Sequence, residues 1–149
     1  MILDTNALSA FVDGEAGVGD VLRRQARAAI PVIVLGEFRH GIARPRHRPT
    51  YEAWLESQLP HFDVLTVTGE TAVAYAELRI ALKRSGRLIP ANDAWIAALA
   101  LQHRLPVLSR DEHFDAVPGL ERQSRWRSAG AARREASRSR SGQRFGRPG

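Results

Sequence analysis

Four acidic residues stand where a folded chain could bring their carboxylates together: Asp4, Glu37, Asp93 and Asp111. Two unit charges 4 Å apart repel by about 4 kcal/mol at an effective dielectric of 20. A cluster of carboxylates therefore needs either protonation or a bound cation. Oxygen ligands select Mg²⁺ or Mn²⁺. Such a site suits hydrolysis of phosphodiester bonds by metal-activated water.

Each of these acids also has an ordinary explanation when it is considered alone. Asp93 near the start of a helix would be favoured by the helix macrodipole, by a few tenths to about 1 kcal/mol. Asp111 could be a loop acid and Glu37 a solvated helix residue, because most acidic side chains are exposed. Asp4 fits this explanation least, because it follows the apolar pair Ile2-Leu3 directly and an unpaired buried carboxylate is costly.

Alternating strand-like and helix-like stretches would position the acids. Apolar runs predict strands at 2–3, 31–35, 62–67 and 105–109. Helices are predicted at 16–29, 36–41, 50–59, 68–86 and 92–103, with Thr68 and Asn92 as caps and Gly86 as a stop. This alternation predicts an α/β fold with a mostly parallel sheet. Ligands of such sheets bind at the carboxyl ends of the strands, where three of the four acids are expected.

The composition limits the kinds of protein that this chain can be. A chain of 149 residues with 44% hydrophobic residues can form one domain with a real core. The absence of cysteine excludes disulfides and thiolate metal sites and fits a reducing cytosol. No apolar run approaches the roughly 18 residues of a membrane span, and no secretory signal is recognisable. We predict a soluble, cytoplasmic protein.

The net charge of +6 is distributed unevenly along the chain. Residues 1–121 carry 13 Lys and Arg against 15 Asp and Glu, whereas residues 122–149 carry nine Arg against one Glu. From residue 124 onward the chain is rich in Arg, Ser, Gly and Ala, a composition typical of disorder. We predict a folded domain over 1–123 and a disordered basic tail over 124–149. The tail is either an RNA-gripping arm or a segment without function, and its composition favours the second.

Three stretches together resemble a PIN domain of the VapC toxin type: "LDTNALSAF", "VIVLGEFRHGI" and "PANDAWIAALALQHRLPVLSRDEHFDAVPGL". The resemblance covers residues 1–121. It implies a three-layer α/β/α sandwich and a Mg²⁺-dependent endoribonuclease, with Mn²⁺ as the other suitable ion. It also implies an RNA substrate, a cognate antitoxin protein that blocks the site, and a homodimer with contacts over 49–59 and 70–86. Members of this family usually carry a few more apolar residues before the first acid, which raises the alternative of a shortened N-terminus.

The resemblance implies roles for particular residues. Asp4, Glu37, Asp93 and Asp111 match the family's acidic quartet, and Asp4 and Asp93 match its direct metal ligands. Glu37 would act through water or help to orient the nucleophile, and Asp111 would serve a second metal or the surroundings of the first. Three polar residues match positions that orient the carboxylates by hydrogen bonds: Thr5, Asn6 and Ser109.

Two other families that place an acid after the first strand do not fit this sequence. A haloacid-dehalogenase-type phosphatase needs a second acid where Asn6 stands, and a receiver domain needs a lysine after a later strand, whereas the single lysine, Lys83, lies within a predicted helix. A catalytically inactive PIN-like protein-binding module stays open. His113 is expected to be a solvated loop residue, and Arg110 either contacts phosphate or balances local charge. The identity of the RNA is not encoded in any recognisable pattern.

Overall fold

The computed structural model describes residues 1–43 and 46–126 of the chain. Five short strands form the sheet: β1 (Ile2–Leu3), β2 (Ala29–Pro31), β3 (Asp63–Leu65), β4 (Val107–Leu108) and β5 (Arg122–Gln123). Six helices connect or flank them: α1 (Thr5–Val12), α2 (Ala16–Arg23), α3 (Val32–Gly41), α4 (Arg48–Gln58), α5 (Gly69–Arg84) and α6 (Ala91–His103). Two short 3₁₀ segments are η1 (Leu59–His61) and η2 (Glu112–Ala116).

The sheet has the order β3-β2-β1-β4-β5, and every pair of neighbouring strands is parallel. Strand β1 lies at the centre, with Ile2 paired to Ala29 of β2 on one side and to Val107 of β4 on the other. The chain passes from β1 outward to β2 and β3 and then returns to the far side of β1. The carboxyl ends of β1 and β4 therefore flank the point where the strand order reverses, which is where ligands bind in open α/β sheets.

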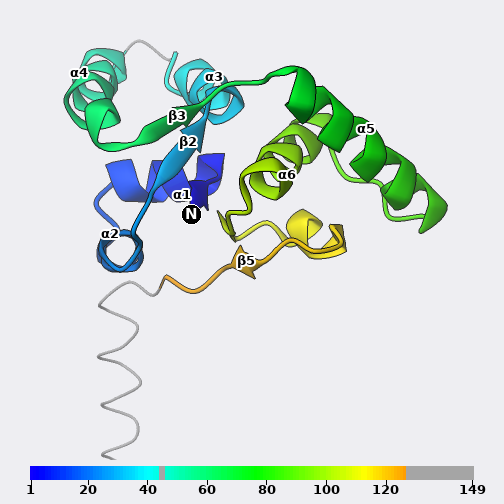
Figure 1. The fold of residues 1–149 in the computed structure, drawn as a ribbon. Coiled ribbons are helices and arrows are strands. Elements are labelled where there is room, and N and C mark those ends of the chain that lie inside the picture. Colours follow the sequence, from blue (N-terminus) through cyan, green and yellow to red (C-terminus); the bar gives the residue numbers. More distant parts are fainter. Residues whose placement is uncertain (44–45, 127–149) are drawn as a thin grey trace, which may run out of the picture.

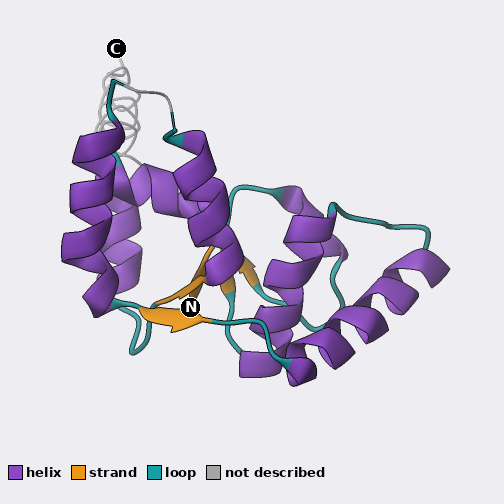
Figure 2. Ribbon diagram, turned by 90° about the horizontal axis from the view of Figure 1, so that it is seen from above, coloured by secondary structure: helices purple, strands orange, loops and turns teal. Residues whose placement is uncertain are grey.

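Helices cover both sides of the sheet, so the three-layer α/β/α architecture with a parallel sheet is confirmed (Figures 1 and 2). Helices α5 and α6 pack against each other on one side of the molecule (Figure 1). Strands β1 and β4 are fully buried between the layers, as parallel strands usually are. Among the described residues, no helix is long and apolar enough to cross a membrane.

The predicted strand over 31–35 is wrong, because β2 ends at Pro31 and helix α3 begins at Val32. Pro31 has an extended backbone and occupies the N-cap position, where its missing N–H costs nothing. Val34 and Phe38 are four residues apart and both buried, whereas Val32 is 43% exposed. The β-branched run thus forms the apolar face of a helix, and Glu37 lies on that helix instead of after a strand.

Other differences concern the ends of elements. The helix expected over 16–29 ends at Arg23. Helix α1 and strand β5 were not predicted; β5 contains Arg122 and Gln123, which carry no apolar signal. The Thr68 cap is confirmed as part of a capping box with Thr71, and Gly86 adopts φ +68° just after α5.

The described chain stays packed on the body as far as Trp126, whose side chain is only 4% exposed. Its indole Nε1 donates a hydrogen bond of 2.8 Å to Glu15 Oε2. The start of the predicted tail, residues 124–126, therefore lies against the domain. The predicted disorder over 127–149 concerns residues outside those that the structure describes.

Candidate active site at the carboxyl end of the sheet

Asp4 stands at the junction of β1 and α1, where the central strand ends and the helix begins. Its backbone N–H donates to Leu108 O of β4 at 3.1 Å, and its backbone occupies the N-cap position of α1. The side chain does not cap that helix. Its Oδ2 instead accepts 2.7 Å hydrogen bonds from Asn6 Nδ2 and Ser109 Oγ. Asp4 is 5% exposed, so these bonds hold a nearly buried carboxylate in one orientation.

Glu37 reaches the same rim from the second turn of α3. Its Oε2 accepts a hydrogen bond of 2.5 Å from Thr5 Oγ1, and its Oε1 accepts one of 2.7 Å from Asn92 Nδ2. Asn92 was predicted to cap α6, but the N-cap is Pro90 and Asn92 lies inside the first turn. Its side-chain amide therefore does not cap the helix and links α6 to Glu37 on α3 by a hydrogen bond.

Asp93 and Asp111 approach each other from α6 and from the loop after β4. His113 lies between them, with Nδ1 at 2.9 Å from Asp93 Oδ2 and 3.0 Å from Asp111 Oδ1. Because carboxylates only accept hydrogen bonds, Nδ1 carries the proton. Asp111 also accepts a bond of 2.9 Å from the His113 backbone N–H, which begins η2. The side chain of His113 is 49% exposed, as expected for a solvated residue, but its bonds to both acids were not predicted.

The electrostatics show that the acids share one site. Burial is the main cause that raises the pKa of Asp4, and the negative charges of Asp93 and Glu37 raise it further against the lowering effect of Ser109. Burial is also the main cause that raises the pKa of Asp93, with Asp111 and Glu37 adding to it and His113 opposing it. The hydrogen bond to Asp93 is the main cause that raises the pKa of His113. The four predicted acids therefore lie along one rim, where Asp93 and Asp111 approach each other most closely and Asp4 and Glu37 act on them through their charge.

The three predicted polar residues lie between these acids. Thr5 bonds Glu37, while Asn6 and Ser109 both bond Asp4 and also each other at 3.0 Å. Ser109 Oγ further accepts from the Asp111 backbone N–H at 2.9 Å. These contacts connect the ends of β1 and β4, and within the described ranges every buried polar side-chain atom has a partner.

A second set of contacts, which was not predicted from the sequence, supports this rim from outside. Arg110 Nη2 bonds Glu15 Oε2 at 2.7 Å, and its guanidinium lies 4.4 Å from the ring centre of Trp126. The Arg110 backbone N–H donates to Asn6 Oδ1 at 3.1 Å. Of the two roles considered for Arg110, the structure shows it balancing local charge. Because these partners are about 100 residues apart in the chain, no local pattern could have identified them.

The donor set fits a hard divalent cation. Carboxylate oxygens of Asp93 and Asp111 lie within 4.8 Å of each other, in a group that includes His113 but not Asp4. The buried carboxylate of Asp4 is close enough for the charges of Asp93 and Glu37 to raise its pKa. Carboxylate oxygens are the ligands that Mg²⁺ and Mn²⁺ prefer. The raised pKa of His113 favours its charged form, which would offset part of the negative charge of Asp93 and Asp111.

Comparisons with known proteins agree with this geometry. The PIN domain family model matches residues 1–120. Ribonuclease VapC5 of Mycobacterium tuberculosis is 37% identical over 125 residues, covering 79% of this chain and 87% of the relative. Ribonuclease VapC4 of the same organism is 30% identical over 99 residues, covering 62% of this chain and 72% of the relative.

Solved structures show the same fold. FitAcB from Neisseria gonorrhoeae superposes with a TM-score of 0.74 at 30% identity, covering 83% of this chain and 96% of that one. VapBC-5 from Mycobacterium tuberculosis, a member of the VapBC family of toxin-antitoxin systems, has a TM-score of 0.64 at 34% identity and covers 81% of this chain and 94% of that one. The chain therefore belongs to the PIN-domain family, of the VapC ribonuclease type.

Proposed function

We propose that this chain is a divalent-metal-dependent endoribonuclease that acts as the toxin of a toxin–antitoxin pair. The observation that carries the proposal is the convergence of four carboxylates at the strand-order reversal, held by Thr5, Asn6 and Ser109. Relatives named as VapC ribonucleases and structures of VapBC complexes support the reaction class and the kind of partner. Mg²⁺ is the proposed ion, and the cytoplasm is the proposed location.

In this proposal Asp4 and Asp93 would hold the ion, with Asp111 beside it. A divalent cation supplies Lewis-acid stabilisation of the negative charge that develops on the phosphate. Asn6 and Ser109 orient Asp4, and His113 orients Asp93 and Asp111. Glu37, fixed by Thr5 and Asn92, would accept a hydrogen bond from the attacking water and position it for in-line attack.

The first prediction tests the metal and the acids together. Asp93→Asn keeps the shape of the side chain but removes one ligand charge, so we expect cleavage of a mixed RNA in Mg²⁺ to fall by at least about 100-fold. EDTA should abolish cleavage by the unaltered protein. Binding of Mn²⁺ followed by calorimetry should weaken in the same variant, which separates loss of metal from loss of chemistry.

Asp20→Asn is the matched control, because Asp20 is an exposed acid on α2 paired with Arg23, away from the site. It should keep full activity and metal affinity. If neither Mg²⁺ nor Mn²⁺ supports any cleavage and neither ion binds, the chain is instead the inactive protein-binding module that the sequence left open. Full activity of Asp93→Asn would also contradict the proposal.

A further inference from the structure

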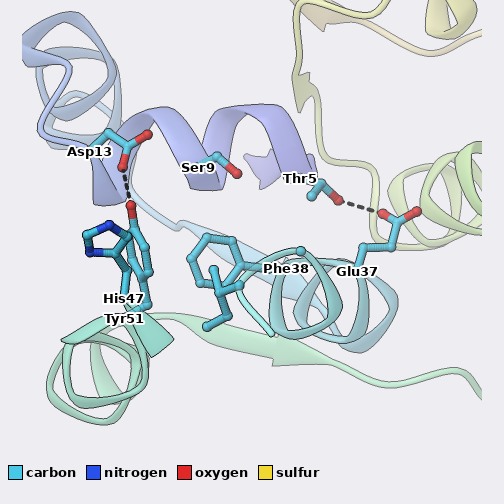
Figure 3. A pocket seen from close by; sticks show the side chains of 9 residues that line it. Thr5, Ser9, Asp13, Glu37, Phe38, His47 and Tyr51 are labelled. Carbon is cyan, nitrogen blue, oxygen red and sulfur yellow. Dashed lines mark hydrogen bonds between the residues drawn. The ribbon is translucent and has the colours of Figure 1, made fainter. Parts of the chain in front are cut away.

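A pocket of about 340 Å³ opens directly beside the proposed catalytic acids, between α1, α3 and α4 (Figure 3). Thr5 and Glu37 line one end of it, and these two residues are hydrogen-bonded to each other at the acid rim. The pocket is therefore continuous with the site. Its volume lies at the lower end of the range for small-ligand pockets.

One wall of the pocket is a row of polar side chains on α1. Thr5, Ser9 and Asp13 are four residues apart, so they lie on one face of the helix (Figure 3). At a rise of 1.5 Å per residue the row extends on the order of 12 Å from the acid rim. At its far end Asp13 Oδ1 accepts a hydrogen bond of 3.1 Å from the Tyr51 hydroxyl.

The opposite wall consists of rings. Phe38 of α3 and Tyr51 of α4 meet edge to face, with ring centres 6.1 Å apart and planes at 89°. His47 meets Tyr51 in the same manner at 6.5 Å. Phe38 is only 4% exposed and belongs to the core, so it gives this wall a rigid base.

We propose that this pocket binds one nucleobase of the RNA, that of a nucleotide next to the phosphate at the acids. The inference rests on the proposed ribonuclease function. A strand whose phosphate lies among the acids must continue past Thr5 and Glu37, and the pocket is the hollow beside them. Proteins recognise single-stranded RNA by stacking unpaired bases on aromatic rings and bonding their Watson–Crick edges, and this pocket offers both kinds of surface.

The polar row also indicates which base fits best. A carboxylate such as Asp13 only accepts hydrogen bonds, and the Tyr51 hydroxyl holds it toward the pocket. Guanine presents two adjacent donors, N1–H and the N2 amino group. Uracil presents one N–H between two carbonyl oxygens, which a carboxylate repels. The pocket should therefore favour guanine over uracil.

The occupant that competes with a base is a basic segment of another protein, attracted by Asp13 and Glu37. The nucleobase is favoured because the pocket adjoins the proposed catalytic acids and offers an aromatic ring beside hydrogen-bonding side chains. Arginine and lysine would not need the Tyr51 ring beside the polar row, which the buried Phe38 supports edge to face. A basic peptide is included as a probe so that the two occupants are distinguished.

The test uses mononucleotides, which contain no phosphodiester bond to cut. The full chain in Mg²⁺ is titrated with 5′-GMP, 5′-UMP and ribose 5-phosphate, and NMR follows the Tyr51 and Phe38 rings and the Ser9 amide. GMP should shift all three and bind about 5- to 100-fold more tightly than ribose 5-phosphate, the range expected for stacking of one base. UMP should bind more weakly than GMP.

Variants separate stacking from edge recognition. Tyr51→Ala should bring the affinity for GMP down to that for ribose 5-phosphate. Tyr51→Phe keeps the ring, so it should retain stacking but reduce the preference for GMP over UMP. Asp13→Asn should reduce that preference as well, whereas Asp20→Asn, which removes a charge outside the pocket, should not. Thermal melts of each variant check that the fold is intact.

The proposal is overturned if no nucleotide shifts Tyr51 or Phe38, if GMP and ribose 5-phosphate bind equally, or if only a basic peptide shifts the pocket residues. These outcomes are distinct from failure of the proposed function. RNA cleavage without any base-dependent shift in the pocket removes the base site alone. GMP binding in the pocket without RNA cleavage under any divalent ion removes the ribonuclease proposal and leaves the base site.

Discussion

Asp4 combines burial with two neighbouring negative charges, and this combination lowers the stability of the protein without a cation. Its pKa is raised chiefly by burial and further by Asp93 and Glu37. A carboxyl whose pKa is higher in the folded state than in the unfolded state destabilises the fold when it is ionised. The arrangement favours metal binding at the expense of stability, as functional sites often do.

The second prediction concerns the stability of the variant Asp4→Asn. In EDTA this variant should melt at a higher temperature than the unaltered protein, because it removes a buried charge but keeps an oxygen that can accept from Ser109. For a domain of about 150 residues, each kcal/mol of added stability raises Tm by about 2–4 °C, so the rise can be measured. Mg²⁺ should stabilise the unaltered protein more than the variant. Calorimetric scans with and without Mg²⁺ measure both effects, and a lower Tm for Asp4→Asn in EDTA would contradict the account.

The third prediction concerns pH and His113. The pKa of His113 is raised by its bond to Asp93, so its contribution to stability is full below the ordinary value of 6.5 and is lost as the pH rises through the higher folded value. The raised pKa values of Asp4 and Asp93 act in the same direction, because protonation on acidification relieves their repulsion.

In EDTA, Tm should therefore increase as the pH falls from about 8 to about 6. His113→Gln, which removes the titrating ring, should flatten this increase. His61→Gln changes an exposed histidine on η1 and should leave it intact. The explanation fails if Tm falls on acidification over this range in the unaltered protein.

At the scale of elements, helices and strand ends share the positioning of the acids. Asp4 immediately precedes α1, Asp93 lies in the first turn of α6, and Glu37 lies on α3.

Helix α5 faces away from the site. Its outer face carries Val73 and Ile80, which are seven residues apart and 60% and 53% exposed. An apolar stripe of this kind is typical of an unpaired helix interface.

The fourth prediction uses this stripe. We expect a symmetric homodimer whose contact lies on α5, since a two-fold axis brings the same stripe of two copies together. Ile80→Lys should shift the protein toward monomer in size-exclusion chromatography with light scattering. Ala53→Lys, at an exposed position of α4, is the matched control for the other segment considered from sequence. Dissociation by Ala53→Lys alone would place the interface on α4 instead.

At the scale of the whole molecule, the end of the described chain is joined to the site. Trp126 packs against Arg110 and donates to Glu15, and Arg110 in turn bonds Asn6, which orients Asp4. Residues 127–149 follow this anchor and carry seven Arg and one Glu. Two truncated chains that differ only in Trp126 distinguish the effect of this side chain from the effect of the basic residues that follow it.

The fifth prediction compares chains ending at Trp126 and at Arg125. The chain ending at Trp126 should keep the Tm of the full protein, while loss of Trp126 should cost about 3–5 kcal/mol, the usual effect of removing a buried tryptophan side chain. If residues 127–149 have no function, RNA affinity should show the same salt dependence with and without them. A shallower dependence after truncation at Trp126 would instead identify an arm that neutralises phosphates.

The sequence by itself determined the class of fold and the cap at Thr68. Both follow from hydropathy and backbone preference within a few residues, which act whatever the rest of the chain does. The error over 31–35 arose at this level, because a short β-branched run suits a strand and a buried helix face alike, and contact of Val34 and Phe38 with the core decided between them. The four acids were predicted from their positions beside the predicted elements and from the resemblance to a PIN domain, and their roles stay predictions.

Only the tertiary structure decided which side chains meet. The bond from His113 to Asp93, the bond from Asn92 to Glu37 and the packing of Trp126 on Arg110 join residues that are 20, 55 and 16 positions apart in the chain. The pocket likewise forms only because Tyr51 of α4 lies beside Asp13, at the end of α1. Such pairings depend on how helices pack across the sheet, and packing is a property of the assembled layers that no local stretch of sequence specifies.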